Sequence, residues 1–195
     1  MRRFAFKPAL TIKGRSNRGL RGFAGKPFHP PLTDVPVTAY MFTAVFDVLS
    51  VTLYSGHEEL AAELFRAGTW TLIGGAAVSL LATLTGWADW HRSTEVGTQA
   101  RRTVNAHAIT MITVTVLVLV NLVVRLADID ADKTPLVLVV LSVLAAALVS
   151  VGSTMGGSLI FDYGFNVETA GDHPAWHRSE QDVLPGHRTS DEKSG

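Results

Sequence analysis

The side chains best suited to chemistry gather between residues 86 and 107, in the stretch GWADWHRSTEVGTQARRTVNAH. This short polar connection contains two Trp, two His and three Arg. Arg101 and Asn105 are four residues apart, so on a helix they share one stripe while His107 points elsewhere. Asp89 lies across the turn from Arg101 and Arg102, and an ion pair with one of them is the natural expectation.

Imidazoles on different helices of a bundle can be the axial ligands of a b-type haem. The candidate pairs are His29 or His91 with His107, although His107 alone lies inside a predicted apolar span. A basic face bordered by Trp87 and Trp90 could instead bind a quinone or an anionic lipid head group. A third interpretation is a structural clamp, in which His107 only hydrogen-bonds the end of a neighbouring helix.

Asp47 lies inside the first apolar tract of the chain. A carboxylate near the middle of a membrane costs roughly 2.5–3.5 kcal/mol on insertion scales. It should therefore face the interior of a bundle and be either protonated or partnered. Two interpretations stay open: a proton- or ligand-linked group, or a structural hydrogen bond to a Ser, Thr or Trp of a neighbouring helix.

Four long apolar tracts must position these groups. They predict helices over about 35–54, 68–90, 102–126 and 135–160. Each can cross a hydrocarbon core of roughly 30 Å, which takes about 20 residues of helix. Continuous apolar runs without period-2 alternation favour helices over barrel strands. Hydrophobic residues make up 47% of the chain and charged residues 17%. The predicted fold is an all-α integral membrane four-helix bundle.

Small residues on the fourth tract predict how it packs. Gly152 and Gly156 form a GxxxG pair, which lets two helix backbones approach closely. Because three other helices of the same chain are available, we expect this face to pack within the chain rather than to form a dimer.

The charge distribution predicts the orientation of the bundle. Residues 1–33 contain eight Lys or Arg and no acid. The connection between the second and third helices contains three Arg, whereas acids outnumber bases in the other two connections. Because basic loops stay in the cytoplasm, both termini and the central turn are predicted there. The basic arm, residues 1–34, is predicted to be mostly irregular, and residues 161–195 form a polar cytoplasmic tail.

Several kinds of site are excluded or unsupported. The chain has no cysteine, which excludes disulfides, zinc–thiolate sites and cysteine-ligated iron–sulfur clusters within it. No set of nucleophile and base and no phosphate loop is visible, so we assign no catalytic residue and expect no enzyme. We assign no metal site, and no nucleic-acid-binding signature accompanies the basic charge.

The order of several motifs resembles a known family. The chain has His29-Pro30 before the first span, an Asp late in it, GWADW closing the second span and Arg-x-x-x-Asn-x-His opening the third. GGSLIFDYGFNV follows the fourth. Over roughly residues 28–167 this pattern is similar to the bacterial four-helix membrane family catalogued as domain of unknown function 2231. In that family a second His commonly follows the His-Pro pair, where this chain has Asp34.

The resemblance implies a setting rather than a reaction. Some relatives contain a Rieske-type iron–sulfur domain after the fourth helix, which implies a place near redox or respiratory proteins of the bacterial inner membrane. The leading expectation is therefore a non-enzymatic multi-pass subunit or scaffold in the lipid bilayer, associated with a Rieske-type or other redox partner. The alternative is an electron-transfer membrane protein that binds haem b or a quinone.

Overall fold

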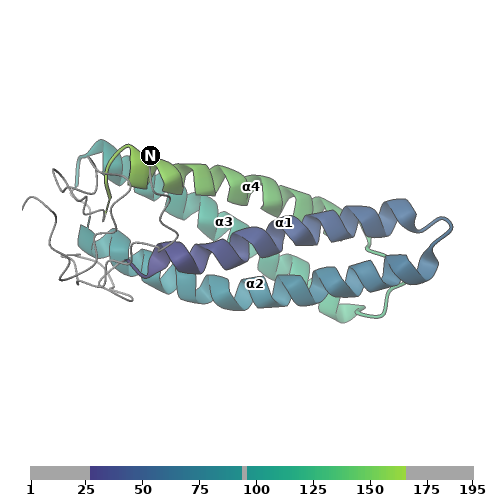
Figure 1. The fold of residues 1–195 in the computed structure, drawn as a ribbon. Coiled ribbons are helices and arrows are strands. Elements are labelled where there is room, and N and C mark those ends of the chain that lie inside the picture. The colour runs from purple at the N-terminus through teal and green to yellow at the C-terminus, as the bar shows by residue number, and fades with distance from the viewer. Residues whose placement is uncertain (1–26, 94–95, 166–195) are drawn as a thin grey trace, which may run out of the picture.

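The computed structural model describes residues 27–93 and 96–165, which form four α-helices. Their bounds are His29–Leu53 (α1), Glu58–Ser93 (α2), Gln99–Ala127 (α3) and Leu136–Phe161 (α4). Figure 1 shows the four helices side by side as one elongated bundle. Most of the predicted basic arm, residues 1–26, and most of the predicted tail, residues 166–195, lie outside the described residues.

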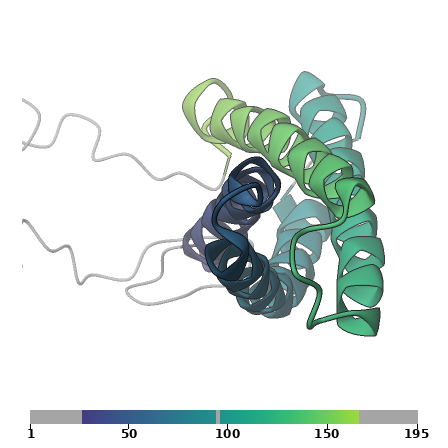
Figure 2. The same cartoon turned by 90° about the vertical axis from the view of Figure 1, so that its right-hand side faces the viewer.

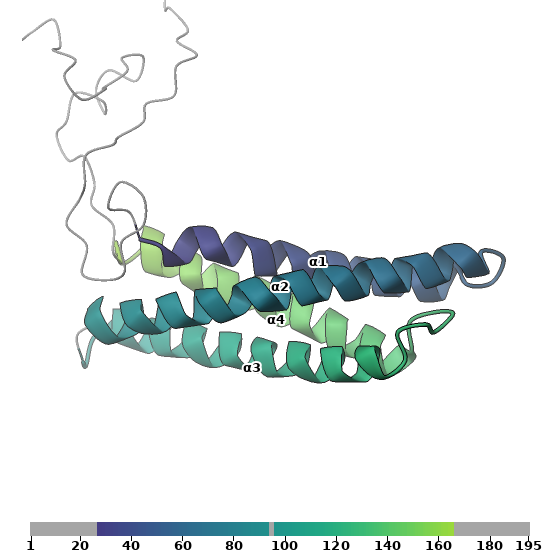
Figure 3. The same ribbon diagram turned by 90° about the horizontal axis from the view of Figure 1, so that it is seen from below.

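The helices form two closely packed pairs. α1 packs most extensively on α2, and α3 on α4, while α1 also contacts α4 and α2 contacts α3. The end view in Figure 2 shows these neighbours around the bundle axis. In Figure 3 the α1–α2 and α3–α4 connections lie at one end and the α2–α3 turn at the other. α1 and α3 are therefore parallel and diagonal, with no close backbone approach between them.

Side chains are distributed as a lipid environment requires. All four helices are long and apolar enough to cross a membrane. Many large apolar side chains point outward, whereas the buried set includes Thr, Ser, Asp, Asn and Arg side chains. Polar groups cannot be left unpaired in hydrocarbon, so they belong inside such a bundle. The predicted all-helical fold with four membrane-spanning helices is confirmed.

Small residues allow the helices to approach one another. A Cβ at Gly75 of α2 would lie 2.6 Å from the Cβ of Ala39 on α1. A Cβ at Gly152 of α4 would lie 2.6 Å from the Sδ of Met111 on α3. The Gly152–Gly156 face is thus used for packing within the chain, as its sequence predicts.

Two helices begin earlier than the apolar tracts indicate. α1 starts at His29 instead of near residue 35, with prolines in its first turn. Proline is tolerated there because the first N–H groups of a helix need no partner within it. α2 starts at Glu58 instead of near residue 68, and its acidic first turn suits the positive end of the helix dipole.

Replacing Gly75 by Ala is expected to destabilise the bundle by about 1–3 kcal/mol, because the new methyl group overpacks the α1–α2 contact. Gly74→Ala is a matched control: the residue adjoins Gly75, and its Cβ would meet nothing within 4 Å. Thermal unfolding of both purified variants in detergent checks this. Equal melting temperatures for the two would contradict it.

Candidate functional site

Two pairs of polar side chains bridge the diagonal helices α1 and α3. One is His29 with His107, here called the histidine pair. The other is Asp47 with Arg125, here called the ion pair. They lie toward opposite ends of the bundle, since Asp47 follows His29 by 18 residues and Arg125 follows His107 by 18 residues.

His29 is the first residue of α1, and its ring packs directly on α2. Its Nδ1 lies 2.9 Å from the carbonyl oxygen of Ala82 and 3.3 Å from Thr85 Oγ1. A Cβ at Gly86 would lie 2.7 Å from His29 Cε1, so only glycine leaves room for the ring there. The predicted start of the helix near residue 35 had left this histidine outside the bundle.

His107 of α3 faces His29 across the bundle. Its Nδ1 lies 2.8 Å from the carbonyl oxygen of Gly152 on α4. The two ring centroids are 6.4 Å apart, and the ring planes are nearly perpendicular, at 81°. Both rings are half-buried.

The hydrogen bonds fix the tautomer of both rings. A backbone carbonyl only accepts, so Nδ1 of His29 and of His107 must carry the proton. In each ring Nε2 then carries the lone pair and is the nitrogen that can bind a metal. Histidines that ligate metals almost always donate their other N–H to a carbonyl, a carboxylate or water, which fixes the ring orientation. The histidine pair has this arrangement in both rings.

The other predicted site residues lie around the same end of the bundle. His91 is exposed and stacks on Trp87, with ring centroids 5.9 Å apart. Trp90 Nε1 donates to Asn105 Oδ1 at 2.7 Å, and the Arg101 guanidinium lies 4.0 Å from the centroid of the Trp90 ring. As the helical spacing predicts, Arg101 and Asn105 share a face, which ties α3 to α2.

Asp89 is almost fully buried, with 4% of its surface exposed. The pairing of Asp89 with Arg101 or Arg102 stays a prediction. Arg102, the neighbouring arginine, donates from Nε to Gln99 Oε1 at 2.9 Å within its own helix.

The ion pair is fully buried, with no exposed side-chain surface on either residue. Arg125 donates from Nη2 to Asp47 Oδ2, from Nε to Asn121 Oδ1 at 2.7 Å and from Nη1 to Thr69 Oγ1 at 3.3 Å. Thr134 Oγ1 donates to the other carboxylate oxygen of Asp47 at 3.2 Å. Such pairing is what makes burial of two charges tolerable.

Further hydrogen bonds extend this network to every helix. The backbone N–H of Thr134 donates to Ser50 Oγ at 3.0 Å, and this hydroxyl donates to the carbonyl of Ala61 at 2.8 Å. Asn121 Nδ2 donates to the carbonyl of Leu138 at 3.3 Å. All four helices and the α3–α4 connection therefore meet at the ion pair.

The sequence predicted an inward-facing Asp47 and considered Ser, Thr or Trp as its partner. The structure brings a threonine, Thr134, to the carboxylate, but the ionic partner of Asp47 is Arg125, which the sequence did not identify as its partner. Two signals could have found it. Arg125 follows Asn121 by one helical turn, and it repeats the 18-residue spacing of α1.

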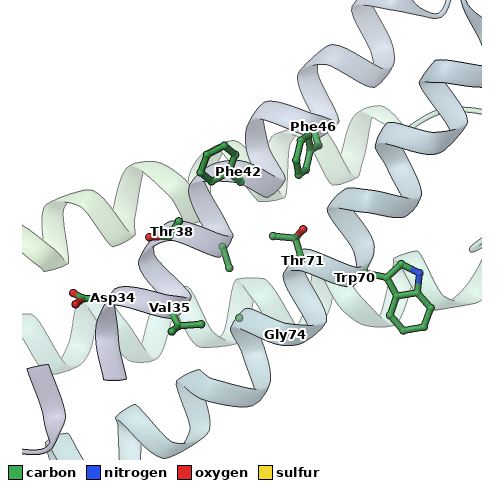
Figure 4. Close-up of a pocket in the computed structure, with 10 residues that line it drawn as sticks. Asp34, Val35, Thr38, Phe42, Phe46, Trp70, Thr71 and Gly74 are labelled. Atoms are coloured by element: carbon green, nitrogen blue, oxygen red, sulfur yellow. The ribbon is translucent and has the colours of Figure 1, made fainter. Parts of the chain in front are cut away.

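A groove of about 660 Å³ runs between α1 and α2, separate from both pairs. Figure 4 shows it between Asp34 at one end and Phe46 and Trp70 toward the other. Its lining is mostly apolar, and Asp34 is the one charged residue in it. Exposed apolar surface of this kind is normal on a helix pair that faces lipid.

Four apolar helices with their polar side chains inside define a multi-pass helical membrane protein. The chain belongs to the family described as predicted membrane protein, domain of unknown function 2231, which matches residues 25–169. The resemblance seen in the sequence is thus confirmed. No curated protein and no solved structure matches the chain.

Replacing Arg125 by Gln is expected to destabilise the fold by about 3–5 kcal/mol, because it leaves the Asp47 carboxylate buried without a countercharge. Arg66→Gln, an exposed arginine on α2, is the control and should change stability little. Thermal unfolding in detergent measures both. A similar small effect in both variants would show that the ion pair contributes nothing particular.

Proposed function

We propose that this protein is an electron-transfer membrane protein that binds a b-type haem, with His29 and His107 as its axial ligands. The observation that carries the proposal is the opposition of two imidazoles whose Nδ1 atoms are both held by backbone carbonyls. Because α1 begins at His29, the second histidine that a haem needs lies inside the bundle.

The spacing of the rings suits a shared metal. His29 and His107 would hold such a metal through Nε2, and with N–metal bonds of about 2.0–2.1 Å their ring centroids would lie about 6 Å apart. The observed centroid distance is 6.4 Å. The two rings come from diagonal helices of the bundle, and histidines on different helices of a bundle can serve as axial ligands.

The ligand count favours haem over a bare metal ion. Within residues 27–93 and 96–165, no group of three or more His, Asp or Glu side chains is close enough to hold a metal. Two imidazoles alone make an incomplete site for zinc, which takes four ligands. A haem contributes its own four nitrogens, and two histidines complete it.

The protein's own part is to hold the two rings. Ala82 and Gly152 fix their orientation through backbone carbonyls, and Gly86 and Gly156 leave room beside them. A Cβ at Gly156 would lie 3.4 Å from His107 Cε1. A bound haem supplies a one-electron couple whose potential depends on its axial ligands and its burial.

Quinone binding has less support than haem binding. The face expected to bind a quinone contains Trp90 and Arg101, and these two bind each other. Arg101 Nη1 donates to the Trp90 carbonyl at 3.0 Å, and its guanidinium covers the ring.

The Lys and Arg distribution supports a cytoplasmic position for the histidine pair and for both termini. We place the protein in the bacterial inner membrane, beside a Rieske-type or other redox partner. α2 continues from Gly86 to Ser93 and α3 begins at Gln99, about two turns before His107. This hairpin projects past the pair and offers the partner a docking surface.

Full-length protein from haem-supplemented cells should show a Soret band with sharp reduced α and β bands in its visible absorption spectrum. His29→Ala and His107→Ala should each abolish this spectrum, because either change removes an axial ligand. His91→Ala is the matched control and should retain it, since His91 stacks on Trp87 at the surface.

A colourless wild-type preparation would falsify the haem proposal. It would leave the other expectation drawn from the sequence, a subunit or scaffold without a cofactor of its own. A spectrum that survives both alanine changes would place the haem elsewhere.

Single cysteines test the orientation, because the chain has none of its own. Val96→Cys lies in the α2–α3 turn, where Val96 is 90% exposed, and Ser55→Cys lies in the α1–α2 connection. A membrane-impermeant thiol reagent should label the first only in inside-out vesicles and the second only in right-side-out vesicles. The reverse pattern would invert the proposed topology.

A further inference from the structure

We infer that the ion pair sets the register of α3 against α1 and so positions His107 opposite His29. Asp47 and Arg125 are positioning residues for the histidine pair. The inference rests on the proposed function where it concerns haem, and on geometry alone where it concerns the two rings.

The first step is that α1 and α3 meet only through side chains. They are diagonal in the bundle and have no close backbone approach, whereas each packs on both α2 and α4. Direct backbone contact therefore does not fix how far α3 lies along the bundle relative to α1. A directional contact between side chains of the two helices can do so.

The second step is the spacing. Asp47 follows His29 by 18 residues, and Arg125 follows His107 by the same number. In a helix, 18 residues make about five turns. The histidine and the charged residue of each helix therefore lie on one face of it, about 27 Å apart. Because α1 and α3 run parallel, one register satisfies both pairs. A slip of α3 by one turn along α1 would separate the two residues of the histidine pair and the two residues of the ion pair.

The third step is that the core between the pairs does not select a register strongly. Its members on the diagonal helices are Ala39, Tyr40, Val114 and Val118, completed by apolar residues of α2 and α4. Apolar contacts are non-directional, and lipid supplies similar contacts to any helix. A buried polar contact is the best-attested device for fixing helix register.

The fourth step is that the ion pair is itself held in place. Thr69 of α2 binds the guanidinium, Thr134 of the α3–α4 connection binds the carboxylate, and Asn121 links Arg125 to the backbone of α4. The Arg125 guanidinium also lies 5.3 Å from the centroid of the Phe65 ring. The ion pair is thus held by several side chains, whereas the ring of His107 is held by the backbone carbonyl of Gly152 and that of His29 by the carbonyl of Ala82.

The test replaces the ion pair by apolar residues of similar size, Asp47→Leu with Arg125→Met. Such replacements of buried pairs are often neutral for stability, so loss of register can be separated from loss of the fold. Spin labels on cysteines replacing Val35 of α1 and Val123 of α3 report the register, since both positions are exposed and lie far apart along the axis. Labels at Val35 and Leu60 of α2 form the control.

With the ion pair intact, we expect one narrow distance between labels 35 and 123. In the apolar variant we expect a broadened distribution or a second distance displaced by several Å, corresponding to a slip of about 5.4 Å per turn. The distance between labels 35 and 60 should not change, because the α1–α2 contact does not involve Arg125. The haem spectrum should fall severalfold in the same variant.

Moving the arginine by one turn gives a second variant, should the apolar one fail to fold. Asn121→Arg with Arg125→Asn keeps the composition and the helix face. It should shift the 35–123 distance to a new single value, because α3 must slide by about 6 Å to restore the ion pair.

A folded variant of either kind with the wild-type distance and the wild-type spectrum overturns the inference. The two proposals fail separately. A wild-type protein without haem defeats the proposed function, while the label distances still decide whether the ion pair sets the register.

Discussion

Helices in a bilayer gain little from hiding apolar surface against one another, because lipid chains are as apolar as leucine side chains. Close packing of small residues and bonds between polar groups must then decide which helices are neighbours. In this bundle close packing of small residues joins adjacent helices, as the contact of Gly75 with Ala39 illustrates. Bonds between polar groups join the diagonal helices, because the ion pair links α1 to α3 through side chains alone. Both means act together with the cost of leaving a buried polar group unpaired in a lipid environment.

The two ends of the bundle use buried polarity differently. At the ion-pair end the charged atoms bind one another and three surrounding polar groups. At the histidine end Nδ1 of each ring lies against a backbone carbonyl, so Nε2 is the nitrogen that could bind a ligand. The first arrangement is complete within the protein, and the second is suited to hold something more. This difference makes the histidine pair, rather than the ion pair, the better candidate for function.

The sequence predicts the four spans well, because length and apolar composition suffice to define a helix that crosses a membrane. It places the starts of α1 and α2 too late, since prolines and acidic residues at a helix start resemble a loop when only hydropathy is considered. That error hid His29 from the bundle and left His107 without a visible partner. Arg125 was missed as the ionic partner of Asp47 because contact across a diagonal depends on which helices pack together, which hydropathy alone does not reveal. The 18-residue spacing shared by α1 and α3 was the signal that pointed to it.

The equal spacing of the two pairs also limits how the protein can change in length. One residue added to α1 between His29 and Asp47 rotates everything beyond it by about 100°, so one of the two pairs must turn away from the axis. Only an equal addition to α3 between its two paired residues would keep the pairs aligned. Only an addition of whole turns would return the two paired residues of each helix to one face. The separation of about 27 Å is close to the hydrocarbon thickness of a bilayer, about 30 Å. A change in the separation of the two pairs therefore has to alter α1 and α3 together.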